Sequence, residues 1–92
     1  MLTVKFTTRF KKDYKTAIKR GCNNKLFEYV VTELMNQQPL PEKFKDHALN
    51  GNYTGFRECH IQPDWLLIYL VENDILTLTL ARTGSHSDLF GK

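Results

Sequence analysis

The chain has 92 residues, of which 41% are hydrophobic and 25% charged, with a formal net charge of +3 at pH 7. We expect a single domain over residues 1–92, because a chain of this length leaves no room for a second core. It has neither an apolar run of the roughly 20 residues that cross a bilayer nor an N-terminal signal peptide, so we expect a cytoplasmic protein with no membrane partner.

The positive charge is concentrated near the N-terminus. Residues 1–25 carry eight lysines and arginines against one acid, Asp13, whereas the rest of the chain carries five basic and nine acidic residues. Such a basic block suits a polyanionic partner, either nucleic acid or an acidic protein, and it equally suits a solvated lysine-rich helix face. Charge alone therefore does not decide the function.

The N-terminal half predicts one strand and two helices. Leu2–Phe6 alternates and is rich in β-forming residues, so we expect a strand there. Apolar residues then recur at helical spacing over residues 9–21 and again over residues 26–36. Side chains that can cap these helices precede each of them, namely Thr7 or Thr8 and Asn23 or Asn24. The short turn between the helices predicts a helical hairpin.

The C-terminal half predicts three strands. Residues 37–54 contain proline, asparagine and glycine, and we expect a long irregular connection, a kind of segment that is often functional. Strand-like runs follow at residues 56–61, 65–71 and 75–83, and the tail Ser85–Phe90 is expected to form one helical turn. This order predicts an α+β domain with the N-terminal strand and helical hairpin packed on a mainly antiparallel four-stranded sheet. The other face of the sheet is then free to host a site.

All three histidines fall in the second half of the chain. His47 lies in the long connection, His60 near a strand end and His86 after the last strand. Histidine gives and takes protons near neutral pH. If the strands pair in order, His60, Asp64 and His86 meet at one rim of the sheet, and the connection delivers His47.

Three chemistries could use this set. A metal site is disfavoured because no HxH or HExxH spacing occurs, and we expect no metal or other cofactor. A Cys59–His60 nucleophile pair is disfavoured because adjacent strand residues point to opposite faces. With no CxxC spacing, Cys22 and Cys59 are expected to be reduced core thiols. Metal-free RNA cleavage needs two proton-transfer groups and a cation, which the histidines, Asp64 and Arg82 supply.

Two features stay open at this point. Trp65 and Phe90 offer aromatic faces on which bases can stack, but Trp65 equally suits a core position. Arg82 falls on the same strand face as Leu78 and Leu80 by period-2 counting. Either the strand contains a bulge, or these leucines line the floor beneath the site.

Two segments of the chain resemble a known family. They closely resemble the YafQ branch of the RelE-like toxins of bacterial toxin–antitoxin systems. The two segments are DHALNGNYTGFRECHIQPDWLLIY (Asp46–Tyr69) and RTGSHSDLF (Arg82–Phe90). The N-terminal strand and hairpin also fit that family, so the likeness covers essentially the whole chain. By this resemblance the family's functional positions fall on His47, His60, Asp64, Trp65, Arg82, His86 and Phe90.

The resemblance implies an endoribonuclease that enters the ribosomal A site and cuts mRNA. It also implies a cognate DinJ-like antitoxin as partner, with operator DNA bound only through the complex. In such a reaction we expect His86 to be the acid, and Asp64 with His47 or His60 to provide the base. Arg82 is expected to hold the phosphate, and Trp65 and Phe90 are expected to position the nucleotide. The same broad fold includes ParE-like gyrase inhibitors, which are not expected to need the histidines. A non-catalytic module that binds an antitoxin and DNA is the alternative from a different class.

Overall fold

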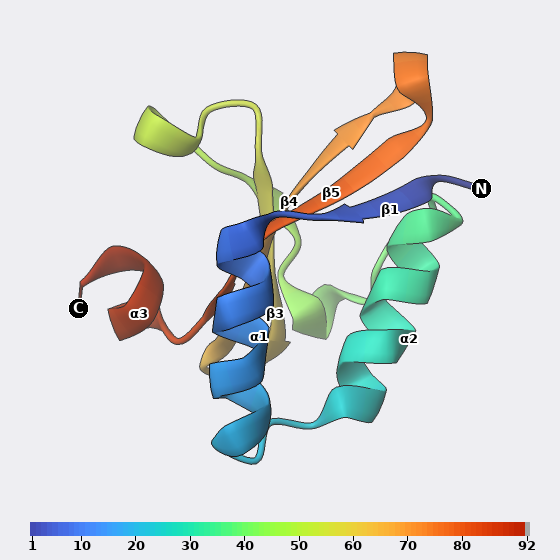
Figure 1. The fold of residues 1–92 in the computed structure, drawn as a ribbon. Coiled ribbons are helices and arrows are strands. Elements are labelled where there is room, and N and C mark those ends of the chain that lie inside the picture. The colour runs from blue at the N-terminus through green and yellow to red at the C-terminus, as the bar shows by residue number, and fades with distance from the viewer. Residues whose placement is uncertain (92) are drawn as a thin grey trace.

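A five-stranded mixed sheet lies at the centre of the fold (Figure 1). The structure is a computed structural model that describes residues 1–91. The strand order is β1-β5-β4-β3-β2, with β1 parallel to β5 and the other pairs antiparallel. The strands are β1 (Thr3–Phe6), β2 (His47–Ala48), β3 (Arg57–Gln62), β4 (Trp65–Glu72) and β5 (Thr77–Gly84). The helices are α1 (Thr8–Lys19), α2 (Asn24–Met35) and α3 (His86–Phe90), with 3-10 turns at Glu42–Phe44, Gly51–Tyr53 and Asn73–Ile75. Within this part of the chain no helix has the length and apolar character needed to cross a membrane.

The α+β architecture is confirmed, but the number of predicted strands is wrong by one. The additional strand, β2, is only two residues long and lies inside the segment predicted to be irregular. Two residues are too few for alternation to be visible in a sequence. The last strand also begins later than predicted, because Leu76 has a left-handed backbone with φ of 50° and both Ile75 and Leu76 are exposed.

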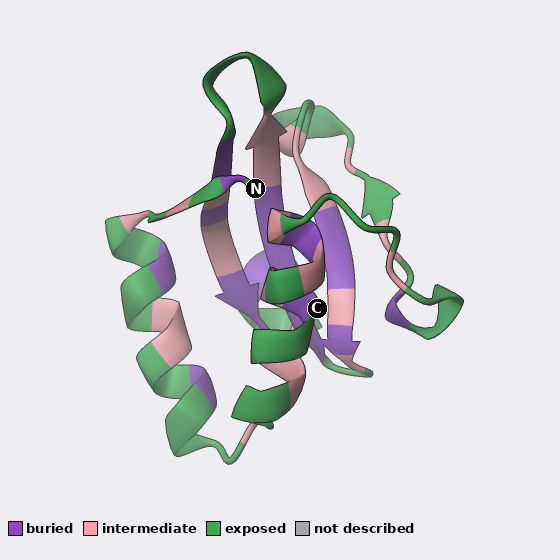
Figure 2. Cartoon of the chain, turned by 90° about the vertical axis from the view of Figure 1, so that its right-hand side faces the viewer, coloured by how far each residue is buried: buried purple, intermediate pink, exposed green. Residues whose placement is uncertain are grey.

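The two longer helices begin where their caps predict. The Thr7 side chain accepts a hydrogen bond from the Phe10 N–H at 2.9 Å, and the Asn23 side chain accepts from the N–H groups of Lys25 and Leu26. Capping of this kind satisfies backbone donors that have no partner in the first turn of a helix. Both helices turn their buried residues toward the sheet and their polar residues outward (Figure 2).

The main core lies between these helices and one face of the sheet. It contains apolar side chains from β3, β4 and β5 together with the helix residues that meet them, including Phe10, Ala17, Val30, Leu34, Cys59, Trp65, Leu67, Tyr69, Leu78 and Leu80. A smaller cluster on the opposite face joins Leu66, Ile68 and Leu89, with Leu49, Tyr53, Phe56 and Ala81 against it. Cys59 is in the main core and Cys22 packs against it, both as free thiols.

A β-bulge in β5 resolves the position of Arg82. Tyr69 pairs with Leu80 and Ile68 pairs with Arg82, so Ala81 is an extra residue without a partner in β4. The bulge shifts the alternation by one, which puts Leu80 on the helix-covered face and Arg82 on the other face with Ile68. The Ala81 carbonyl, freed from the ladder, accepts a 2.8 Å hydrogen bond from the Thr7 hydroxyl. The start of α1 is thereby fixed beside the bulge.

Candidate active site

Four neighbouring strands present one row of residues on the face that α1 and α2 leave open. His47 pairs with Glu58, Glu58 with Ile68, and Ile68 with Arg82. Residues opposite one another in adjacent strands share a face of the sheet. The next row begins with His60, which pairs with Leu66. Two histidines, a carboxylate and an arginine are therefore carried on a single sheet face by β2, β3 and β5.

The three histidines form a continuous group on this face. The ring centroids of His47 and His60 are 6.4 Å apart, and those of His60 and His86 are 5.5 Å apart. His47 reaches the group because its short strand pairs with β3, and His86 reaches it because α3 turns back immediately after β5. The structure thus brings together the histidines that the strand order predicted to meet.

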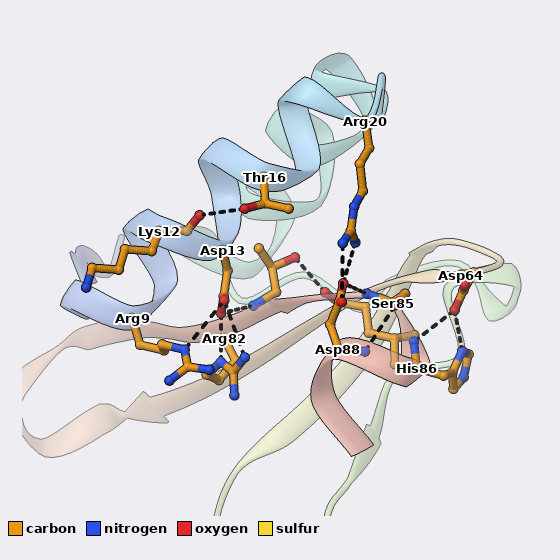
Figure 3. Close-up of polar contacts among 12 residues, drawn as sticks. Arg9, Lys12, Asp13, Thr16, Arg20, Asp64, Arg82, Ser85, His86 and Asp88 are labelled. Carbon is orange, nitrogen blue, oxygen red and sulfur yellow. Dashed lines mark hydrogen bonds and ion pairs between the residues drawn. The ribbon is translucent and has the colours of Figure 1, made fainter. Parts of the chain in front are cut away.

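Asp64 holds His86 in one orientation. A single carboxylate oxygen, Oδ1, lies 2.9 Å from the His86 backbone nitrogen and 2.7 Å from its Nδ1 (Figure 3). These hydrogen bonds, the backbone one foremost, hold the pKa of Asp64 below its ordinary value. An ionised carboxylate only accepts, so Nδ1 of His86 carries the donated proton and Nε2 is left for a substrate.

Glu58, which the sequence reasoning did not single out, lies between the other two histidines. Its Oε1 is 3.5 Å from Nε2 of His47 and 3.6 Å from Nε2 of His60, while the side chain is only 6% exposed. The second oxygen, Oε2, is buried without a hydrogen-bond partner among the described residues. A buried carboxylate in this position provides a counter-charge for either imidazolium ring.

His60 has the environment of a neutral imidazole. Burial lowers its pKa, and the nearby His86, Lys45 and His47 lower it further, while Glu58 acts in the opposite direction. The ring lines an open pocket of about 570 Å³ together with His86, Lys43 and Lys45. This volume lies within the range of about 300–1,000 Å³ that small-molecule sites occupy. The pocket therefore joins two proton-transfer groups and two cations.

His47 is held differently. Its Nδ1 lies 2.7 Å from the backbone carbonyl oxygen of Lys45. Because a carbonyl oxygen only accepts, Nδ1 of His47 is protonated and Nε2 is directed at Glu58. The carboxylate of Glu58 thus lies between the rings of His47 and His60 and is near Nε2 of both.

Arg82 is engaged by α1 and does not contact the histidines in the described part of the chain. Its Nε lies 2.7 Å from Oδ2 of Asp13 and its Nη2 lies 3.3 Å from Oδ1 (Figure 3). Hydrogen bonding to Asp13 raises the pKa of Arg82, and Tyr53 acts in the same direction. Arg82 lines a second hollow of about 660 Å³, whose wall also includes Asp64 and Asp88. The guanidinium of Arg82 is thus fixed near the site by its ion pair with Asp13.

The two aromatic candidates lie in different environments. Phe90 is 40% exposed and makes an edge-on contact with Tyr53 at a centroid distance of 6.3 Å. Trp65 is 2% exposed and stacks on Phe27 in the main core at 6.0 Å. The expectation that Trp65 positions a nucleotide is therefore wrong, because its ring lies on the helix-covered face and packs in the main core.

Four contributors to the site were missed from the sequence. Glu58 and His60 are two residues apart in one strand, and that spacing is the signal that could have placed Glu58 beside the histidines. Lys43, Lys45 and Tyr53 lie in the long connection, where no periodicity predicts the direction of a side chain. The shape of that connection had to be known before they could be assigned.

Comparisons with known proteins give one consistent result. Residues 2–91 match the sequence family described as the bacterial toxin of type II toxin–antitoxin system, YafQ. The mRNA interferase toxin YafQ of Escherichia coli (strain K12) is 39% identical over 89 residues, which are 96% of this chain and 95% of that protein.

Solved structures show the same fold. A metal-bound toxin from Helicobacter pylori is 48% identical with a TM-score of 0.92, over 98% of this chain and 100% of that one. The E. coli DinJ–YafQ complex contains a chain that is 38% identical with a TM-score of 0.89, over 99% of this chain and 100% of that one. This chain belongs to the YafQ family of bacterial toxins of type II toxin–antitoxin systems.

Proposed function

We propose that this protein is the toxin of a type II toxin–antitoxin pair and cuts mRNA as an endoribonuclease. The observation that carries the proposal is the placement of His60 and His86, 5.5 Å apart between ring centroids, on the wall of one pocket. Two imidazoles at that separation can serve the two oxygens of one phosphodiester. The name of the E. coli relative, an mRNA interferase, describes the same reaction.

The proposed reaction needs no external nucleophile. His60, neutral because its pKa is lowered, takes the proton from a ribose 2′-hydroxyl. The 2′-oxygen attacks the adjacent phosphorus, and the bond from phosphorus to the 5′-oxygen breaks. His86, which acts as an imidazolium with a proton on each ring nitrogen, gives that oxygen its Nε2 proton and keeps the Nδ1 proton hydrogen-bonded to Asp64. The products are a 2′,3′-cyclic phosphate and a 5′-hydroxyl. Asp64 fixes the ring of His86 and provides a counter-charge for its imidazolium form, a role that follows from its two hydrogen bonds.

The negative charge that grows on the phosphate requires cations, and several lie within reach. Lys43 and Lys45 line the histidine pocket, and Arg82 lines the neighbouring hollow. Cations positioned before the reaction stabilise charge that develops in the transition state. Exposed Phe90 beside Tyr53 offers an aromatic face for a base next to the cut.

The mRNA is proposed to be cut in the ribosomal A site in the cytoplasm. Lys11, Lys12 and Lys15 are exposed on α1, and such a cationic surface suits the phosphate backbone of ribosomal RNA. Reversing charge there with Lys12→Glu and Lys15→Glu is expected to weaken ribosome binding and reduce its salt dependence, with kcat unchanged. Unchanged binding at every salt concentration contradicts a ribosome-binding role for this surface.

The proposed partner is a DinJ-like antitoxin, with operator DNA bound only by the complex. Support comes from the E. coli relatives, which are known in complex with DinJ. An antitoxin that blocks the site keeps the nuclease inactive until it is removed.

The proposal includes no metal ion, although the H. pylori relative is described as metal-bound. Among residues 1–91, no three or more His, Cys, Asp or Glu side chains form a group that could hold a metal ion. No step of the proposed reaction is assigned to a metal ion.

Primer extension on cellular mRNA after induction tests the proposal. Wild-type protein is expected to give discrete new 5′ ends within translated regions, and His86→Ala is expected to give none while remaining folded. A non-catalytic module gives no new ends with either protein. New ends of equal intensity with both proteins contradict the assigned site.

A further inference from the structure

An ion pair joins the end of α1 to α3, the short helix that carries His86. Arg20, the C-cap of α1, places Nη1 2.5 Å from Oδ2 of Asp88 and Nη2 3.4 Å from Oδ1 (Figure 3). The two residues are 68 positions apart in the sequence. This fork of two N–H groups on one carboxylate fixes direction as well as distance.

The same carboxylate also organises the start of α3. The Ser85 N–H donates to Oδ2 of Asp88 at 2.9 Å, and the Asp88 N–H donates to the Ser85 hydroxyl at 3.1 Å, which is a reciprocal capping box. A Cβ added at Gly84 would lie 2.9 Å from the Cβ of Asp88, so the side chain of Asp88 packs directly on the chain that leaves β5. Asp88 therefore sets the path of the backbone on both sides of Ser85.

His86 is the next residue along this path. Its backbone N–H and its Nδ1 must reach the same oxygen of Asp64, so its orientation depends on where α3 begins. A helix of five residues has too few internal hydrogen bonds to be stable alone. On the sheet side α3 is fixed by buried Leu89, and on the α1 side by Arg20.

We propose that Arg20 is a positioning residue for His86, acting through the carboxylate of Asp88 and the cap of α3. The proposal rests on the proposed function, in which His86 gives a proton to the leaving oxygen. Without the Arg20–Asp88 contact, α3 starts in several nearby positions and the His86 ring is presented correctly only part of the time. A reacting group displaced by about 1 Å can lose up to about 100-fold in rate.

The contact is exposed, with side-chain exposures of 52% for Arg20 and 32% for Asp88. Exposed ion pairs contribute little to global stability. The effect of breaking this pair is therefore expected on kcat, while the thermal midpoint and the KM for ribosome-bound mRNA stay close to wild type. That separation distinguishes positioning from general destabilisation.

Four variants test the inference by cleavage of mRNA on ribosomes with the full chain. Arg20→Ala is expected to lower kcat by about 10-fold. Arg20→Lys is expected to recover part of the loss, because it keeps the charge but not the fork. Lys19→Ala removes the same charge from the adjacent exposed position and is expected to leave kcat unchanged. Asp88→Asn keeps an oxygen for the Ser85 cap but loses the charge, and should match Arg20→Ala.

Two further measurements exclude a merely structural role. NMR of the imidazole nitrogens, at a pH where the ring is neutral, is expected to show a single Nδ1-protonated tautomer of His86 in wild type and in Lys19→Ala, but a mixture of tautomers in Arg20→Ala. The double variant Arg20→Ala/Asp88→Asn is expected to be no slower than either single variant, because both break one contact. Additive losses, or a loss in Lys19→Ala as large as in Arg20→Ala, overturn the inference.

Failure of this inference is distinguishable from failure of the proposed function. If His86→Ala is inactive and Arg20→Ala has the wild-type kcat, only the positioning role is wrong. If His86→Ala is fully active, the assignment of the reaction to this site is wrong, whatever Arg20 does.

Discussion

Nδ1 and the backbone nitrogen of His86 both lie within 2.9 Å of the same oxygen of Asp64. One carboxylate thus fixes the position of the residue and the tautomer of its ring. Sequence reasoning assigned Asp64 to the base, together with a histidine. The two hydrogen bonds favour a different division, in which Asp64 supports the acid and His60 is the base.

Replacement of Asp64 tests this division. Asp64→Asn keeps an oxygen for the His86 N–H but removes the negative charge, so the ring loses its preferred tautomer. We expect kcat for mRNA cleavage to fall by about 100-fold, as for other groups that orient a histidine. The control Asp74→Asn removes an exposed acid from the turn before β5 and should leave kcat unchanged. Equal activity of the two variants contradicts the assigned role.

The pH profile tests His60 as the base. Glu58 favours the protonated form of His60 and Lys45 disfavours it, although burial is the largest cause of its lowered pKa. The acid limb of kcat/KM follows this group in the free enzyme. Glu58→Gln is therefore expected to move that limb to lower pH, and Lys45→Ala to higher pH. Shifts in the same direction, or none, argue against His60 as the base.

Replacement of Trp65 is expected to lower stability, whereas replacement of Phe90 is expected to slow cleavage. Trp65→Phe leaves a space beside Phe27 in the core and should lower the free energy of unfolding by about 1–3 kcal/mol without a comparable loss of kcat. Phe90→Ala changes an exposed side chain, so unfolding should shift by less than about 1 kcal/mol while cleavage slows. Urea unfolding and cleavage rates measured on the same preparations decide the point. A catalytic defect confined to Trp65→Phe reverses the assignment.

Acid should weaken the attachment of α3. Hydrogen bonding from Arg20 foremost, and then from Ser85, lowers the pKa of Asp88 from 3.8 to about 2. A carboxyl group whose pKa is lowered by folding contributes stability that is present above its unfolded pKa and lost as the pH falls through the folded value. That contribution is therefore complete above about pH 5 and lost between about pH 4 and pH 2.

Solvent screening keeps the size of this contribution below about 1 kcal/mol for an exposed pair. Unfolding measured at a series of pH values should show a smaller acid-dependent loss in Asp88→Asn than in wild type. The Asp74→Asn variant provides the matched control. Identical pH dependence of Asp88→Asn and wild type excludes the contribution.

Much of this arrangement follows from the sequence because it depends on strand order. Pairing of consecutive antiparallel strands predicts that His60 lies near Asp64 and His86. For Arg82, period-2 counting allowed two explanations of its position, which were a bulge in the strand or a floor of leucines beneath the site. The bulge at Ala81 is the alternative that the structure supports. It depends on a tertiary contact, the Thr7 hydroxyl on the Ala81 carbonyl, which no local pattern reveals.

What could not be predicted depends on contacts between distant segments. Glu58 is an acid in a strand, and such residues are usually solvated. Its burial follows from the position of β2, a strand too short to be recognised. The pair of Arg20 and Asp88 likewise forms only once α1 and α3 are in place.

The most direct test of the central claim is cleavage of ribosome-bound mRNA that contains a single 2′-deoxyribose at the preferred cut position. If the 2′-hydroxyl is the nucleophile, the deoxy substrate stays intact at that position, while the all-ribose substrate yields a 2′,3′-cyclic phosphate and a 5′-hydroxyl. Cleavage of the deoxy substrate at the wild-type rate, or a product with a 5′-phosphate, contradicts proton transfer by His60 and His86 as the basis of the activity.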